Sequence, residues 1–360
     1  MGKGLERLKE GLAKSKVDMT KKSALFLKSA DEIQPVQRLS SGSLVADYIL
    51  GGGWAVGRIN EVCGVYSSGK STLSLMTIVE AQRKGQSCIY IDAEGAFDNK
   101  YAAVLGVDFN PEKLAILDSN NGEFIKAIIL EALQDSEENN LGLIVIDSVS
   151  AVVPTDAHTR GEETDAIAQN ARFWSEFCRV LANLCREKNV TCIVVNQTRV
   201  KFDFQGNKKY AAIEDKIEVT GGNSLKFYKS LSLYMETRAK ESDKEALSEI
   251  SDDKVTHSYG NKIYMKTIKN KTADPFVYGH AFIRYGQGFD NLHSAIPIFI
   301  KKNLIEQDGS VYKFANLKGE ETKIKSVEKL YVPLKKDPDL CGKWLESLGF
   351  ALCGDNYFRK

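Results

Sequence analysis

A single stretch, residues 59–72, limits what this chain can fold into more than any other part of the sequence. It contains Gly64-x-x-x-x-Gly69-Lys70-Ser71, the pattern of a phosphate-binding loop. Its glycines let the backbone curl so that several N–H groups point at one anion. Lys70 adds a positive charge near the outer phosphates, and the Ser71 hydroxyl can ligate Mg²⁺. The pattern predicts a site for a nucleoside triphosphate and Mg²⁺.

The residues on both sides of the loop have the pattern that such a site requires. Residues 59–63 alternate apolar and polar and predict a short strand, while Leu73, Met76 and Val79 recur at helical spacing. A helix that begins at the loop points the positive end of its dipole at bound phosphates. A tight turn that binds nothing is the alternative, and this context disfavours it. The predicted nucleotide contacts in the loop are Gly64, Val65, Tyr66, Ser67, Ser68, Gly69, Lys70, Ser71 and Thr72.

Three further apolar segments predict buried strands, and each ends in polar residues. Residues 87–94 end in Asp92 and Glu94, residues 141–147 end in Asp147, and residues 190–197 end in Gln197. Because helical patterns alternate with these strands, the sequence predicts an α/β fold with a mostly parallel sheet that helices cover on both faces. Ligands of such sheets bind at the carboxyl ends of the strands. We therefore expect Ser71, Glu94, Asp147 and Gln197 to meet, with Asp147 reaching Mg²⁺ through water.

Charge and cysteine usage exclude some classes of protein. The net charge is +1, so the chain as a whole does not have the excess of positive charge typical of nucleic-acid binders. One segment does suit single-stranded nucleic acid: a predicted loop at 198–220 mixes basic and aromatic side chains, although acidic residues nearly cancel its charge. Seven scattered cysteines predict free thiols in a reducing, cytoplasmic compartment, and no apolar run is long enough to span a membrane.

The two ends of the chain differ in character from the middle. Residues 3–16 predict an amphipathic helix and residues 24–27 a short strand; the first 28 residues carry eight Lys or Arg against three acids. This segment is either a solvated tail or an arm that docks on another subunit. We predict three parts: 1–35, the ATPase core 36–288, and a small α/β domain 289–360.

From about residue 38 to 290 the chain resembles the RecA family of homologous-recombination ATPases, cellular or viral. The order and spacing of the shared motifs match those of the family. They are Leu39-Ser-Ser-Gly-Ser-Leu44, Gly57-Arg-Ile-Asn-Glu61, Ser67-Ser-Gly-Lys-Ser71, Tyr90-Ile-Asp-Ala-Glu94, Leu105-Gly-Val-Asp108, Val145-Ile-Asp-Ser148, Val195-Asn-Gln-Thr-Arg199, Gly221-Gly-Asn-Ser-Leu-Lys-Phe-Tyr228 and Ile268-Lys-Asn-Lys271.

The resemblance implies a role for each residue of the site. Glu94 would orient the attacking water, and Gln197 would sense the γ-phosphate. Asp98 and Tyr101 would contact ribose and adenine. Lys269 and Lys271 would reach the phosphates of a neighbouring subunit, so that hydrolysis requires a filament. The residues implied to be catalytic are Glu94, Lys70, Gln197, Lys269 and Lys271, with Ser71 and Asp147 at the metal.

The resemblance also implies partners: single-stranded DNA, homologous duplex DNA, other copies of the chain in a helical filament, and single-strand-binding and loading proteins. The N-terminal segment would be the polymerisation arm, Phe227 would lie at the subunit interface, and the activity would serve recombination, repair and the SOS response. The implied DNA contacts are Arg160, Gly161, Arg172, Arg199, Lys201, Phe202, Phe204, Lys208, Lys209, Gly221, Gly222 and Asn223.

The sequence departs from the family pattern at the phosphate loop. Val65-Tyr66 stands where bacterial members usually have Pro-Glu, so that a carboxylate near the subunit boundary is missing, and Ser71 stands where they have Thr. Two other functions share parts of this pattern. A hexameric helicase would have the same loop and strand-end acids, and a filament-forming mediator would bind ATP without turnover.

Overall fold

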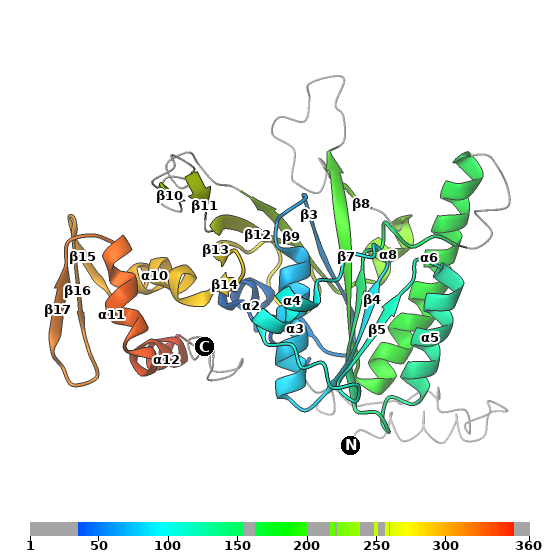
Figure 1. Ribbon diagram of the computed structural model, residues 1–360, viewed down its shortest axis with the longest axis horizontal. Helices are drawn as coiled ribbons and strands as arrows, with labels where there is room; N and C mark the ends of the chain where they lie inside the picture. The colour runs from blue at the N-terminus through cyan, green and yellow to red at the C-terminus, as the bar shows by residue number, and fades with distance from the viewer. Residues whose placement is uncertain are drawn as a thin grey trace, which may run out of the picture. The chain divides into compact units, whose positions relative to one another are not determined.

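The computed structural model describes residues 35–154, 163–200, 217–219, 222–237, 248–250, 256–258 and 260–348 (Figure 1). Arg38–Lys360 forms one compact unit. The helix expected at 3–16 and the strand expected at 24–27 lie outside the described residues. The domain boundaries proposed at 35/36 and 288/289 remain predictions.

The described residues form a ten-stranded mixed sheet. Its neighbouring strands are parallel from one edge to β9, and the remaining strands continue the sheet in antiparallel pairs. The predicted parallel sheet is confirmed, and the antiparallel extension adds to it. The order is β5 (Leu114–Asp118), β4 (Ser87–Asp92), β6 (Leu141–Asp147), β7 (Thr191–Val200), β3 (Ile59–Gly64), β9 (Leu231–Thr237), β12 (Gly260–Asn270), β13 (Tyr278–Arg284) and β14 (Gly288–Asp290), with β8 (Ile217–Val219) paired to β7.

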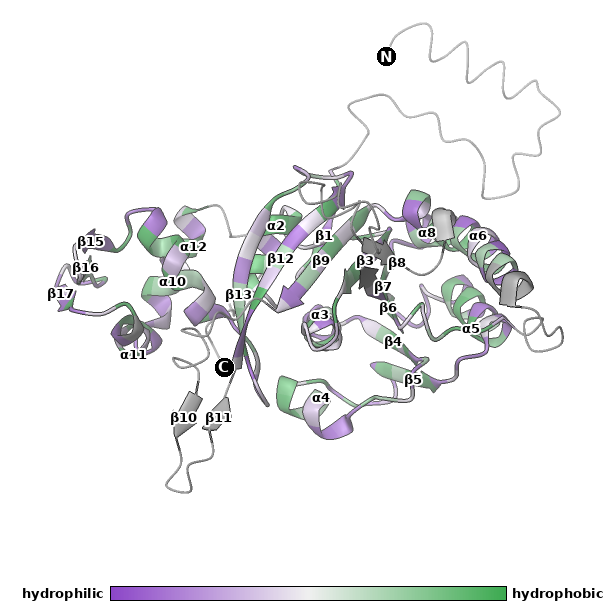
Figure 2. Ribbon diagram, turned by 90° about the horizontal axis from the view of Figure 1, so that it is seen from above, coloured by the Kyte–Doolittle hydropathy of each residue, from purple (hydrophilic) through white to green (hydrophobic). Residues whose placement is uncertain are grey.

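Helices cover both faces of the parallel strands, which is why β3 and β6 are buried along their whole length. On one face α3 packs against β3, β4, β6 and β7; on the other, α5 and α6 pack over the same sheet (Figure 2). The described α-helices before β9 are α2 (Leu44–Leu50), α3 (Lys70–Arg83), α4 (Asn99–Leu105), α5 (Gly122–Gln134), α6 (Glu163–Lys188) and α8 (Gly222–Tyr228).

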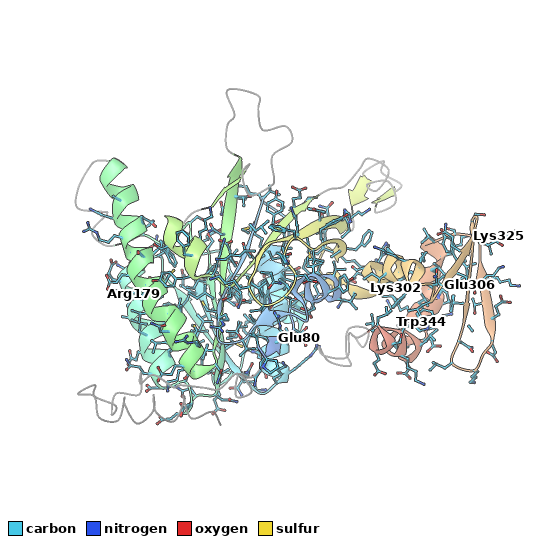
Figure 3. All side chains as sticks on the ribbon, turned by 180° about the vertical axis from the view of Figure 1, so that it is seen from behind. Glu80, Arg179, Lys302, Glu306, Lys325 and Trp344 are labelled. Atoms are coloured by element: carbon cyan, nitrogen blue, oxygen red, sulfur yellow. The ribbon has the colours of Figure 1, made fainter. Side chains whose placement is uncertain are left out.

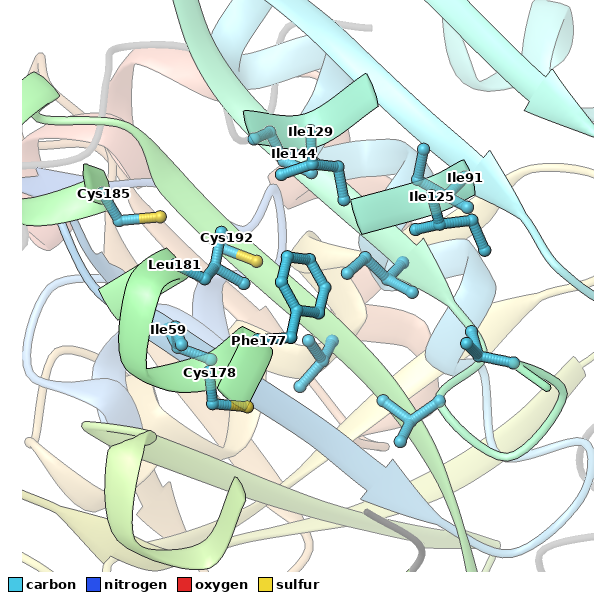
Figure 4. Packing of buried hydrophobic residues seen from close by; sticks show 14 of the residues in the cluster. Ile59, Ile91, Ile125, Ile129, Ile144, Phe177, Cys178, Leu181, Cys185 and Cys192 are labelled. Atoms are coloured by element: carbon cyan, nitrogen blue, oxygen red, sulfur yellow. The ribbon is translucent and has the colours of Figure 1, made fainter. Parts of the chain in front are cut away.

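The largest apolar cluster lies between α6, α5 and the sheet (Figure 4). Trp174 and Phe177 of α6 are fully buried there against Ile129 and Ile144. The apolar face of this helix is therefore part of the core. Three free cysteines, Cys178, Cys185 and Cys192, fill the same core.

The remaining described elements are short helices and strands. Trp344 of α12 packs edge-on against Phe299 and Phe314, and so joins the last helix to α10 and to a three-stranded sheet (Figure 3). The polar stretch between β9 and β12 contains a hairpin of two short antiparallel strands. These elements are β1 (Arg38–Leu39), β2 (Trp54–Ala55), β10 (Ser248–Ile250), β11 (Thr256–Ser258), α10 (Asn291–Lys301), β15 (Glu306–Asp308), β16 (Val311–Ala315), β17 (Glu321–Ile324), η3 (Glu328–Leu330), α11 (Tyr331–Lys335) and α12 (Pro338–Ser347).

Gly64, the last residue of β3, gives the first prediction. A Cβ at this position would lie 1.9 Å from the Met235 carbonyl oxygen on β9. We expect Gly64→Ala to lower the free energy of unfolding by about 2–4 kcal/mol, because two paired strands must separate. Urea denaturation measures the loss. Gly85→Ala is the control: Gly85 also has positive φ, but nothing lies within 4 Å of the added Cβ. Equal losses in the two variants would contradict the steric argument.

Candidate active site

The loop between β3 and α3 has the geometry that its glycines predict. Gly69 precedes the first turn of α3 with φ 83°, a left-handed conformation that favours glycine. A Cβ at Gly69 would lie 3.1 Å from Ile283 Cδ1, so side chains packed behind the loop also limit this position. The Ser68 hydroxyl donates to the Val65 carbonyl at 2.8 Å and holds the loop closed. Tyr66, in the same loop, is 78% exposed.

Lys70 is the buried cation of this loop. Its side chain is folded back over the loop, and Nζ donates to the Val65 carbonyl at 2.7 Å and to the Gly64 carbonyl at 3.2 Å. Burial lowers the pKa of Lys70, and the nearby Asp147 carboxylate opposes that shift. A largely desolvated ammonium beside free N–H groups is a strong point of attraction for an anion.

Asp147, at the end of β6, lies across from the start of α3. Its carboxylate accepts hydrogen bonds from the Tyr90 hydroxyl at 2.8 Å and from Ser71. Burial raises the pKa of Asp147, and the two hydrogen bonds partly counter the shift. The structure thus brings the two predicted magnesium ligands into direct contact. Tyr90, which orients the carboxylate, was not anticipated; its place on β4, two residues before Asp92, gave no signal.

Glu94 and Gln197 contact each other near Asp147 and Ser71. Gln197 Nε2 donates to Glu94 Oε1 at 2.9 Å, although Gln197 lies on β7 and Glu94 follows β4. The Ser148 hydroxyl donates to the same carboxylate oxygen and lies 2.7 Å from the Ser150 hydroxyl. The ends of β4, β6 and β7 therefore converge beside the phosphate loop, as expected. Ser148 was missed as a site residue, although it directly follows Asp147.

Asp92 has a structural role, because its carboxylate binds backbone N–H groups. Strand β4 ends at Asp92, and its carboxylate accepts the N–H groups of Ala96 at 3.1 Å and Phe97 at 2.8 Å. Asp92 and Glu94 would share a face only if the strand continued, and it does not. Asp92 thereby folds the segment that presents Glu94 to solvent.

The two residues expected near the base and ribose lie at the start of α4. Asp98 caps this helix by accepting from the N–H groups of Lys100 at 2.9 Å and Tyr101 at 3.0 Å. The Tyr101 hydroxyl lies 3.0 Å from Thr72 Oγ1, so this ring packs beside the first turn of α3. Both residues therefore flank the loop.

Lys269 and Lys271 lie at the opposite end of the sheet. Asn270 between them pairs with Leu231, which also pairs with Asn60 at the start of β3, whereas the phosphate loop follows the end of β3. Lys269 Nζ donates to the Lys226 carbonyl at 2.6 Å and Lys271 Nζ to the Phe227 carbonyl at 3.2 Å, so both cap the C-terminus of α8. Burial, together with the charges of Lys271 and Lys229, lowers the pKa of Lys269 to about 8. Within one chain these lysines cannot reach the phosphate loop.

The loop expected at 198–220 is shorter than predicted. Strand β7 continues to Val200 and pairs with β8, with Arg199 opposite Glu218. The prediction of a loop was wrong for residues 198–200 and 217–219. Their polar sequence suggested a loop, but their backbones pair as two antiparallel strands. Arg172 is exposed on α6. Gly222 and Asn223 begin α8. The expected DNA contacts Arg160, Gly161, Lys201, Phe202, Phe204, Lys208, Lys209 and Gly221 lie outside the described residues.

Two further observations limit the chemistry. None of the described helices has both the length and the apolar character needed to cross a membrane. In the same residues, no group of three or more His, Cys, Asp or Glu side chains is arranged to hold a metal ion.

Known proteins are similar to this chain over most of its length. The family model described as the RecA N-terminal domain matches residues 6–290. Protein RecA of Thermotoga petrophila is 34% identical over 344 residues, which cover 95% of this chain and 88% of the relative. Protein RecA of Mycoplasma mycoides subsp. mycoides is 36% identical over 339 residues, with 93% and 90% covered. Protein RecA of a Sulfurovum species is 34% identical, with 91% and 88% covered.

Proposed function

The chain belongs to the RecA family, and from that membership we propose how its own residues carry out the family's reaction. Proteins of this family are ATP-dependent recombinases that act in DNA recombination and repair. They are DNA-dependent ATPases that form filaments on single-stranded DNA and pair it with homologous duplex. Family membership establishes that activity for this chain. We propose the roles of its individual residues in that activity.

ATP fits the loop and its surroundings. The N–H groups at the start of α3 and the Lys70 ammonium would hold the β- and γ-phosphates. Ser71 and Asp147 would hold Mg²⁺, a cation that takes one or two protein oxygens and completes its shell with phosphate and water. When bound, Mg²⁺ neutralises charge that develops on the phosphates. Tyr90 keeps the Asp147 carboxylate facing Ser71. Tyr101 and Asp98 would contact the adenine and ribose.

Glu94 is the proposed base of the reaction. It would orient a water whose oxygen attacks the γ-phosphorus, while the bond to the bridging oxygen breaks and ADP leaves. The proton of that water passes toward the Glu94 carboxylate. Gln197 and Ser148 both donate to Glu94 Oε1 and so fix its rotamer. Gln197 lies on β7, three residues before the strand ends at Val200, and the proposed DNA-binding segment 198–220 begins next to it. DNA bound there would act on the base through this amide.

Lys269 and Lys271 are proposed to act on a neighbouring subunit. They lie at the end of the sheet away from their own phosphate loop, close to Phe227, whose side chain is 69% exposed on α8. Cations supplied in trans stabilise the charge of phosphoryl transfer. This placement explains why turnover would require a filament. It also gives two clustered lysines, of which Lys269 is partly buried, a role that a surface strand alone does not.

The remaining assignments concern DNA and location. The region 160–165, with Arg172 just beyond it, and the segment 198–220 are proposed as the two DNA-binding regions, and residues 1–35 as the polymerisation arm. Single-strand-binding and loading proteins are proposed partners. We place the protein in the cytoplasm, because the described cysteines are buried and free, as in a reducing compartment.

The contact between Glu94 and Gln197 beside the phosphate loop carries this proposal, and one assay tests it. ATP hydrolysis is measured with and without single-stranded DNA over a series of protein concentrations. We expect at least tenfold stimulation by DNA and a rate that rises more steeply than linearly with protein, because sites form between neighbours. DNA-independent turnover that is linear in protein would contradict the proposal. Unwinding of a forked duplex would favour a hexameric motor, and filaments without turnover a mediator.

A further inference from the structure

A buried ion pair lies at the junction of the phosphate-loop strand and the tract that faces the neighbour. Glu61 is completely buried in the middle of β3, three residues before Gly64. Its carboxylate forms an ion pair with Lys229, which is itself only 3% exposed. Burying two charges is costly, so such a pair is weak evidence for stability and raises the question of another role.

The partners of Glu61 come from two sides of the molecule. Asn196 Nδ2 donates to Glu61 Oε1 at 3.2 Å, and Asn196 directly precedes Gln197, which contacts the proposed base Glu94. Lys229 binds the other oxygen, Oε2, and it follows the last residue of α8. One carboxylate thus joins the nucleotide side to the neighbour-facing side.

The backbone around Lys229 extends this connection to the lysine tract. The Ser230 N–H donates to the Ile59 carbonyl of β3 at 2.8 Å, and the Ser230 carbonyl accepts the Lys271 N–H at 3.0 Å. Lys269 and Lys271 in turn cap α8 through the carbonyls of Lys226 and Phe227. A shift of α8 would therefore move both lysines and strain the Glu61–Lys229 pair.

Burial would by itself raise the pKa of Glu61, but the Lys229 ammonium and the hydrogen bonds from Lys229, Ser232 and Asn196 hold it below its usual value. The carboxylate is therefore charged at neutral pH and is held by both sides at once. A charged group with fixed partners has few alternative positions in a low-dielectric interior. The Glu61–Lys229 pair therefore transmits a displacement of α8 to β3 better than a contact between apolar side chains, which can slide past each other.

We propose that Glu61, Asn196 and Lys229 are positioning residues that couple the nucleotide site of one subunit to the lysine tract it offers to the next. This inference rests on the proposed function, in which Lys269 and Lys271 act in trans. Its consequence is cooperative hydrolysis: the occupancy of one site sets how well that subunit completes its neighbour's site.

The test separates coupling from stability. The double variant Glu61→Gln/Lys229→Met removes both charges and leaves neither one unpaired, and Asn196→Ala removes only the tie to the nucleotide side. Ser232→Ala is the comparison that keeps both charges: the Ser232 hydroxyl donates to Glu61 Oε2 and accepts from Lys229, and its removal leaves the ion pair and Asn196 in place. ATP hydrolysis is measured against ATP concentration at saturating single-stranded DNA, and nucleotide affinity is measured for the free proteins.

We expect the double variant and Asn196→Ala to bind ATP within twofold of the wild type while their Hill coefficient falls to about 1; Ser232→Ala keeps the wild-type coefficient. Wild-type coefficients in both coupling variants would overturn the inference and leave the proposed function standing. A wild-type protein without DNA-stimulated, cooperative turnover would overturn the proposed function and this inference with it. If the double variant does not fold, Asn196→Ala alone decides, since it keeps both charges of the ion pair.

Discussion

Replacing Glu94 by Gln is expected to abolish ATP turnover and leave ATP binding intact. The amide keeps the size of the side chain and can still accept hydrogen bonds from Gln197 and Ser148, but it cannot take a proton. Loss of a positioned general base lowers rates by about 10²–10⁴-fold. Single-stranded DNA-stimulated phosphate release measures kcat, and equilibrium binding of a nucleotide measures affinity.

Ser148→Ala provides the matched comparison for this variant. It removes one donor to the Glu94 carboxylate and leaves the carboxylate itself. We expect it to lower kcat less than tenfold, because Gln197 still orients the base. Turnover of Glu94→Gln at the wild-type rate would show that the base lies elsewhere, and equal losses in both variants would show that orientation is the larger part of the effect.

A mixture of two inactive variants is expected to hydrolyse ATP. Lys269→Met/Lys271→Met retains its own base and phosphate loop but offers no cations to a neighbour, so its homogeneous filaments should lose about 10³–10⁵ in kcat, as when an arginine finger is removed. Glu94→Gln offers intact lysines and has no base. At a mixed boundary of the right orientation the first variant supplies the site and the second the lysines. The mixture should therefore recover activity in proportion to such boundaries.

Two comparisons make that result specific. Lys226→Met changes an exposed cation at the C-terminal end of α8 and should keep near-wild-type activity.

The charge of Lys269, whose pKa is about 8, is lost as pH rises through that value. Its contribution to kcat/KM is therefore full well below pH 8 and declines as pH rises through 8. Lys269→Met should remove this decline. A mixture as inactive as its components would contradict action in trans.

The motifs near strand ends could be predicted because their spacing determines their place. A phosphate loop between a strand and a helix, and acids after apolar strands, must meet at one edge of a parallel sheet. Glu94, Asp147 and Gln197 converge for that reason. Asp92 has the same sequence signal as Glu94, and only the end of β4 distinguishes a structural carboxylate from an exposed one.

Other parts of the site depend on pairings that no local pattern records. Tyr90 reaches Asp147 across two adjacent strands, and Lys229 reaches Glu61 over 168 residues of sequence. The place of Lys269 and Lys271 depends on the register of β12 against β9, which is set by the packing of the whole sheet. From sequence alone these lysines resemble an ordinary charged strand. Their distance from the phosphate loop, and hence the case for action on a neighbour, is visible only in the fold.

The separation of phosphate loop and lysine tract gives each subunit two unlike ends. In the proposed function one end receives cations and the other provides them, so contacts between copies would be head-to-tail and the assembly would have a direction. Under the proposed arrangement a row of n subunits contains n − 1 complete sites, and one terminal subunit holds ATP that it cannot hydrolyse. That terminus acts as a cap: subunits behind it can turn over while it keeps its nucleotide, and loss of subunits from the two ends becomes unequal. Directional growth and shrinkage of the polymer then follow from where two lysines lie on one strand.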